Sequence, residues 1–162
     1  MNYSVISFLE ERLKPDHSVF EYGSGYSTVF FARLAGSVTA VEHDGRWLDY
    51  VRDMCPGNTF LKFKDLDEDG QYCRASSDDG LRYQVVVVDG RDRNNCLAQC
   101  INALAEDGVV LLDDLDWNRY ESEIKEYIDN GFRILEFEGM KPTETKLYRS
   151  ALLYRDQNCL GV

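Results

Sequence analysis

The sequence has little proline, little histidine and no cysteine pair with metal-ligand spacing. Only three prolines and two histidines occur among 162 residues, and the five cysteines form no C-x-x-C pair. Cys96 and Cys100 lie four residues apart with no histidine nearby, so they are read as packing residues. The odd cysteine count argues against a closed disulfide framework and favours a cytoplasmic location.

A basic segment followed by an unbroken apolar run is also missing from the N-terminal region, where Glu10 and Glu11 interrupt the apolar pattern. Neither a signal peptide nor a membrane span is therefore expected. The net charge of −11 repels phosphate backbones and anionic lipids. We expect a small-molecule acceptor rather than a nucleic acid or a membrane partner. The length suits a single domain over residues 1–162.

Helical and strand patterns alternate along the chain. Asp44 is expected to cap a helix whose burial spacing runs through Trp47, Leu48, Val51 and Met54. The segment 65–80 is rich in Asp, Gly and Ser and is expected to be mostly irregular, as a binding loop would be. The other expected helices are 3–13, 27–35, 95–104 and 118–130, and the expected strands are 18–22, 37–42, 59–64, 85–88, 108–112, 132–138 and 146–154.

This order predicts an α/β fold with a doubly wound, Rossmann-like sheet of about seven strands and helices on both faces. The all-valine run 85–88 is typical of a central parallel strand buried on both faces. The last two strands follow each other directly, so the final strand is expected to be antiparallel. Ligands bind such sheets at the carboxyl ends of the strands, where Glu21, Glu42, Asp89 and Asp113 all fall.

A glycine turn follows the first strand. Gly23 and Gly25 permit a sharp turn and a close backbone approach to a ligand, and the helix that begins near Ser27 directs free N–H groups toward the same point. Thr28 stands where a dinucleotide fingerprint G-x-G-x-x-G has its third glycine. Nicotinamide or flavin binding is therefore disfavoured.

These motifs resemble those of the class I S-adenosylmethionine-dependent methyltransferases, over nearly the whole chain. Glu21-x-Gly23-x-Gly25-x-Ser27 resembles the first motif of that family, with serine at the third glycine position, and Val87-Val88-Asp89-Gly90 resembles the fourth. The resemblance implies S-adenosylmethionine as cofactor, with Gly23 and Gly25 beneath its methionine part and Glu21 near the cleft. It also implies that Glu42 accepts hydrogen bonds from the ribose, and we expect Glu42 to be exposed at its strand end.

Asp89 is the first candidate for the residue that orients or deprotonates the methyl acceptor. A strand-end cap or a contact to the cofactor is the alternative role for Asp89. His43 is the second catalytic candidate, with an ordinary loop residue as its alternative. Tyr26 is expected at the cofactor and, with Trp117 and Tyr120, forms either an aromatic pocket or part of the core.

Charged residues after two of the strands leave further roles open. Arg91 and Arg93 either hold an acidic group of a substrate or form solvated ion pairs. Asp113 and Asp114, together with Asp89, raise the question of a Mg²⁺ site, although we assign no metal.

The function expected from the sequence is methyl transfer from S-adenosylmethionine to a small molecule, such as a hydroxyl acceptor, by in-line displacement. A nicotinamide-dependent oxidoreductase and an aminopropyl transferase are the alternative enzymes. A non-catalytic nucleotide-binding or scaffold subunit is the alternative that is not an enzyme.

Overall fold

The computed structural model describes residues 1–78, 80–142 and 144–162, and a seven-stranded sheet runs through these ranges in the order β3-β2-β1-β4-β5-β7-β6. Strands β1 to β5 are parallel, and β7 lies antiparallel between β5 and β6. The strands are β1 (Ser18–Tyr22), β2 (Ser37–Glu42), β3 (Thr59–Phe63), β4 (Tyr83–Val88), β5 (Leu104–Asp113), β6 (Arg133–Met140) and β7 (Leu147–Tyr154). The predicted Rossmann-like sheet, with its antiparallel last strand, is confirmed.

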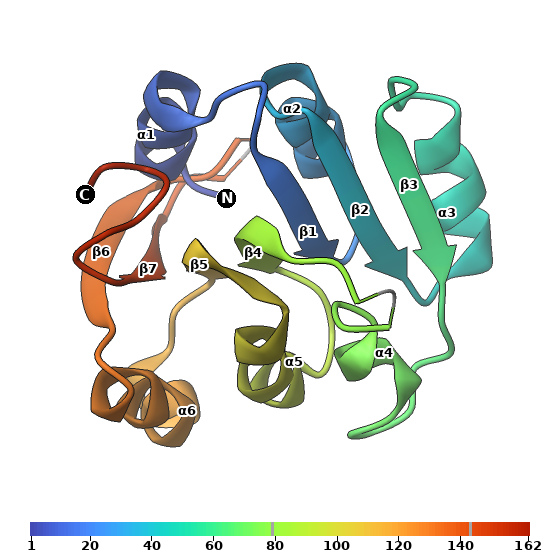
Figure 1. Cartoon of the computed structure of the whole chain (residues 1–162). Helices are drawn as coiled ribbons and strands as arrows, with labels where there is room; N and C mark the ends of the chain where they lie inside the picture. The colour runs from blue at the N-terminus through green and yellow to red at the C-terminus, as the bar shows by residue number, and fades with distance from the viewer. Residues whose placement is uncertain (79, 143) are drawn as a thin grey trace.

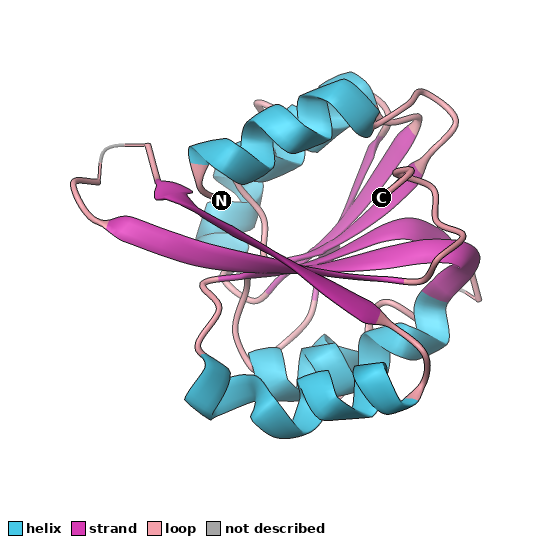
Figure 2. Cartoon of the chain, turned by 90° about the vertical axis from the view of Figure 1, so that its left-hand side faces the viewer, coloured by secondary structure: helices cyan, strands magenta, loops and turns pink. Residues whose placement is uncertain are grey.

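Helices cover both faces of this sheet (Figure 1 and Figure 2). They are α1 (Tyr3–Arg12), α2 (Tyr26–Leu34), α3 (Gly45–Arg52), α4 (Gln71–Arg74), α5 (Arg93–Cys100) and α6 (Trp117–Asp129). Helices α1 and α2 lie on one face, and α4, α5 and α6 lie on the opposite face (Figure 1). Within the described ranges, none of the helices has the length and hydrophobicity needed to cross a membrane.

The core divides into two layers because successive side chains of a strand point to opposite faces. In β4, Val86 and Val88 pack with α4, α5 and α6, whereas Val85 and Val87 pack with α1 and α2. All four valines are fully buried. A strand buried on both faces must be apolar at every position, which explains the valine run.

The segment 65–80 is mostly irregular, as expected, although it contains the short helix α4, whose Tyr72 is buried; Asp79 of that segment lies outside the described residues. Two other local expectations need correction. Strand β5 begins at Leu104, and the preceding helix ends at Cys100 in a 3₁₀ turn. Trp47 was expected to be buried, yet 38% of its surface is exposed, and only Leu48 and Val51 of α3 are buried.

Candidate functional site

A cleft of about 540 Å³ lies where the carboxyl ends of β1, β2 and β4 meet. The chain reverses at this edge after each parallel strand, so the residues that follow the strands come together there. The cleft is lined by Glu21, Tyr22, Gly23, Ser24, Ser27, Glu42, His43, Asp44, Trp47, Tyr72, Asp89, Gly90, Arg91 and Arg93.

Two glycines let the turns after β1 and β4 pass very close to each other. Gly23 has a φ of +90°, and its N–H donates to the carbonyl of Val41 at 2.9 Å. A Cβ on Gly23 would lie 3.1 Å from the Cα of Gly90, and a Cβ on Gly90 would collide with the hydroxyl of Tyr72. Glycine is therefore required at position 23 chiefly by its positive φ and at position 90 by the lack of space for a Cβ.

Glu21, at the end of β1, lies buried beneath the first turn of α2. Its two carboxyl oxygens accept hydrogen bonds from the hydroxyls of Ser27 and Thr28, each at 2.5 Å. Burial raises the pKa of Glu21 to about 8, although these two hydroxyls oppose that change. Near neutral pH the side chain is therefore mostly protonated, and one of its oxygens then donates to its hydroxyl partner instead of accepting.

Glu42, at the end of β2, is buried rather than exposed, because the chain folds its own donors around the carboxylate. Oε1 accepts from the backbone N–H groups of His43 at 2.8 Å and Asp44 at 3.0 Å. Oε2 accepts from the N–H and the hydroxyl of Ser24, both at 3.1 Å. Since a carboxylate has about four lone-pair sites, a ribose hydroxyl must replace one of these donors, and the rotatable Ser24 hydroxyl is the easiest to replace.

His43 follows directly and reaches the same cleft. Its Nδ1 lies 2.8 Å from Oε1 of Glu42, and its ring packs edge-on against Tyr72 with centroids 6.0 Å apart. The ring is thus held by its neighbours at the wall of the cleft.

Asp89 directly follows β4 and lines the cleft, with Arg93 beside it. One guanidinium nitrogen of Arg93 donates to Oδ1 of Asp89 at 3.1 Å, and Arg93 also bonds the carbonyls of Gly90 and Asp113. These contacts make Arg93 a structural residue, whereas Arg91 remains exposed at the cleft. Burial, and then the negative charge of Asp113, raise the pKa of Asp89 to about 6. Asp89 is therefore mostly ionised at neutral pH, and its carboxylate can accept a proton.

Ligand oxygens of Asp89, Asp113 and Asp114 lie within 4.8 Å of one another, so the predicted convergence of these three acids occurs. Positive groups already face them, however. Lys141 bonds both Asp113 and Asp114 at 2.7 Å, and the Met1 ammonium lies 3.1 Å from Asp113. Burial opposes ionisation of Asp113, but these cations and the Ser150 hydroxyl bring its pKa down to about 2. The arrangement is an ion-pair network, and we assign no metal to it.

Tyr72 is a cleft residue that the sequence did not reveal. Its side chain is buried and lines the cleft, and its hydroxyl has no hydrogen-bond partner among the described residues. A buried donor left without a partner costs about 1–3 kcal/mol, so such a group points to a ligand. Tyr72 was not predicted because it belongs to the segment 65–80, which was expected to be mostly irregular.

Several predicted residues lie elsewhere. Gly25 is covered by the Trp47 ring, which would lie 3.6 Å from a Cβ at that position, and it does not line the cleft. Tyr26 is 68% exposed, and its hydroxyl contacts that of Tyr50 at 3.2 Å, because the first residue of α2 points away from the cleft. Tyr120 belongs to the core, and Trp117 bonds Glu136, so neither forms an aromatic wall of the cleft.

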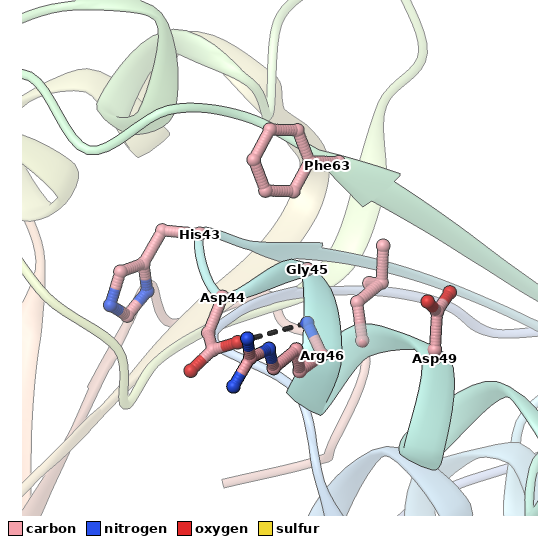
Figure 3. A pocket seen from close by; sticks show the side chains of 7 residues that line it. His43, Asp44, Gly45, Arg46, Asp49 and Phe63 are labelled. Carbon is pink, nitrogen blue, oxygen red and sulfur yellow. Dashed lines mark hydrogen bonds between the residues drawn. The ribbon is translucent and has the colours of Figure 1, made fainter.

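A broad, shallow hollow of about 860 Å³ continues from the cleft past the ends of β2 and β3. It shares His43 and Asp44 with the cleft, and the ring of Phe63 lies over Gly45, 3.6 Å from where a Cβ of that residue would be (Figure 3). The Asp44 side chain caps α3 by accepting from the N–H of Arg46 at 2.9 Å. The ring of Phe63 is about half exposed and is free to contact a flat ligand.

No sequence-family profile and no curated protein matches the chain, but many solved structures share its fold. A Streptococcus mutans protein in complex with SAH has a TM-score of 0.65 at 13% identity, covering 93% of this chain and 96% of that one. An rRNA methylase from Streptococcus thermophilus has a TM-score of 0.64 at 15% identity, with 94% and 95% covered. A methyltransferase-like protein from Silicibacter pomeroyi DSS-3 has a TM-score of 0.65 at 23% identity, with 96% and 87% covered. The chain has the fold of the S-adenosylmethionine-dependent methyltransferases.

Proposed function

We propose that this chain is an S-adenosylmethionine-dependent methyltransferase that acts on a small-molecule hydroxyl acceptor. One observation carries the proposal: the glycine turn, Glu42, Asp89 and the unpartnered Tyr72 hydroxyl line a single cleft on a methyltransferase fold. The complex of the Streptococcus mutans protein with SAH, the product of this cofactor, supports the choice of cofactor.

The charges around the glycine turn also favour this cofactor over a dinucleotide. The Ser24 N–H and the Ser27 hydroxyl, both beside the glycine turn, already donate to carboxyl groups of the chain itself, those of Glu42 and Glu21. A pyrophosphate would need those donors and would meet Glu42 and Asp44 at close range. A sulfonium and an α-ammonium are cations, which these carboxylates attract.

S-adenosylmethionine supplies an activated methyl group, so the chain itself mainly has to bind the cofactor and orient the acceptor. Glu42 accepts from the ribose hydroxyls after Ser24 rotates, and the Tyr72 hydroxyl donates to the bound cofactor. Phe63 offers its ring to the purine. Asp89 orients the acceptor hydroxyl and takes up its proton as the methyl carbon is attacked, while His43 holds the wall of the cleft.

Titration calorimetry with S-adenosylhomocysteine and NAD tests the proposal. We expect S-adenosylhomocysteine to bind and NAD to give no heat at millimolar concentration. Gly23→Ala should abolish binding, whereas Gly131→Ala should not, because both glycines have positive φ but only Gly23 lines the cleft. Tight NAD binding without S-adenosylhomocysteine binding would favour the oxidoreductase instead. Cofactor binding with no methyl transfer to any acceptor would favour a non-catalytic subunit.

The net charge of the chain is the reason for proposing a small-molecule acceptor. The chain carries a net charge of −11, which opposes approach to a polynucleotide. An rRNA methylase is among the proteins that share the fold, so RNA is the competing acceptor. Methyl transfer from labelled cofactor to RNA, measured beside transfer to small alcohols and phenols, separates the two.

A further inference from the structure

A second, more apolar pocket of about 500 Å³ adjoins the cleft. It lies between α1, the start of α2 and the connection from β6 to β7, and it is lined chiefly by Ile6, Tyr26, Ser27, Phe30, Lys141 and Pro142. Ser27 also lines the cleft, so this residue borders both hollows. We call it the α1–α2 pocket.

The α1–α2 pocket also lies close to Asp89. Lys141 in its wall bonds Asp113 and Asp114, and oxygens of these two acids lie within 4.8 Å of a carboxyl oxygen of Asp89. A molecule seated in this pocket is therefore near both the cleft and the group that can take its proton.

Its walls select against charged ligands. Ile6, Phe30, Pro142 and the Tyr26 ring present carbon surface. The Lys141 side chain is 17% exposed and its ammonium already pairs with Asp113 and Asp114, and the Met1 ammonium, also in the lining, pairs with Asp113, so carboxylates of the chain already neutralise both cations of the wall. Glu144 adds a negative charge to the lining. An anion would be repelled, whereas a flat, neutral molecule would bury its apolar body against the two aromatic rings.

We infer that the α1–α2 pocket binds the methyl acceptor, a neutral aromatic alcohol of small-molecule size; this rests on the proposed function. Its volume is that of a pocket for one small molecule and not of a groove for a polymer. In the reaction a bond forms between the acceptor oxygen and the methyl carbon as the bond from sulfur to that carbon breaks. The electron pair stays on sulfur, which becomes a neutral thioether, and the hydroxyl proton passes to Asp89 and then to water.

The probe for this inference is 1-naphthol, with 1-naphthoate as its anionic counterpart, both titrated into protein saturated with S-adenosylhomocysteine. We expect 1-naphthol to bind and 1-naphthoate to bind at least about tenfold more weakly, which corresponds to about 1.4 kcal/mol. Labelled cofactor should also methylate 1-naphthol.

Two variants locate the probe. Tyr26→Ala removes an exposed ring and should weaken 1-naphthol binding at least about fivefold, while Phe30→Trp should block the pocket by filling it. Phe60→Ala is the matched control, because Phe60 is an aromatic residue of similar exposure on the distant edge strand β3. Phe60→Ala should leave 1-naphthol binding unchanged. Tyr26 is exposed, so its variant tests the inference even if Phe30→Trp fails to fold.

The possible failures are distinguishable. If S-adenosylhomocysteine binds but 1-naphthol does not, or binds Tyr26→Ala and wild type equally, the pocket assignment is wrong and the cofactor proposal stands. Preferential binding of 1-naphthoate overturns the stated acceptor chemistry. If S-adenosylhomocysteine itself does not bind, the proposed function fails and the acceptor role fails with it.

Discussion

Ser24, in the turn after β1, is joined to Glu42, at the end of β2, by two hydrogen bonds. The backbone N–H and the hydroxyl of Ser24 both donate to Oε2 of Glu42 at 3.1 Å. The acid that resembles a ribose-binding residue thus also holds the glycine turn in place. Affinity and stability should therefore change together when Glu42 is altered.

Glu42→Gln should lower the affinity for S-adenosylhomocysteine at least about fivefold and cost about 1–3 kcal/mol of stability, because an amide cannot accept on both sides. Calorimetry and urea denaturation measure the two effects. Ser24→Ala, the control, removes only the hydroxyl that competes for Oε2 and should leave affinity unchanged or higher. A folded Glu42→Gln protein with unaltered affinity would remove Glu42 from the ribose role.

Tyr72→Phe should lower S-adenosylhomocysteine affinity by about five- to tenfold while leaving the melting temperature unchanged or slightly raised, because its hydroxyl has no hydrogen-bond partner among the residues that the structure describes. Tyr127→Phe is the matched control. The Tyr127 hydroxyl donates to the Leu97 carbonyl at 2.8 Å, so that variant should lose stability and keep affinity. A large loss of stability in Tyr72→Phe, with affinity intact, contradicts the proposed contact.

Asp89→Asn should reduce turnover by about 100-fold or more and change cofactor affinity little, since a base acts mainly in the transition state. The pKa of about 6 gives the sign of the pH dependence: wild-type turnover should rise as pH passes through about 6 and then level off. The variant should lack that rise. A large drop in S-adenosylhomocysteine affinity or in melting temperature would instead assign Asp89 to cofactor binding or to structure.

Glu21 should make the protein less stable as pH rises. Its pKa increases from 4.5 to about 8 on folding, so the folded chain holds a proton that the unfolded chain has released across that interval. The stabilisation is complete below about pH 4.5 and is lost as pH rises through about 8. Each pKa unit corresponds to about 1.4 kcal/mol.

Glu21→Gln, which mimics the protonated side chain, should flatten this dependence in urea denaturation between pH 5 and pH 9, a range of about four units. Glu138→Gln provides a control, because Glu138 forms an exposed pair with Arg149. An unchanged slope in Glu21→Gln would show that Glu21 is ionised in the folded protein.

Local patterns in the sequence were sufficient to predict the strands of the sheet. β1 and β2 begin and end where predicted, because turn-forming residues bound short apolar runs at both ends. The buried valines of β4 required a strand covered on both faces. With the strands and their order known, Glu21, Glu42 and Asp89 had to fall at one edge, and the structure brings them into one cleft.

Contacts between distant segments were decided only by the tertiary structure. Tyr72 enters the cleft because α4 packs beneath the turns after β1 and β4, a contact that leaves no periodic signal in residues 65–80. Glu42 is buried because Ser24, eighteen positions earlier, folds onto it. Tyr26 faces away from the cleft because the helix begins one residue earlier than expected and turns its side chain outward. The sequence determined which chemical groups gather at the edge, and packing determined which of them face a ligand.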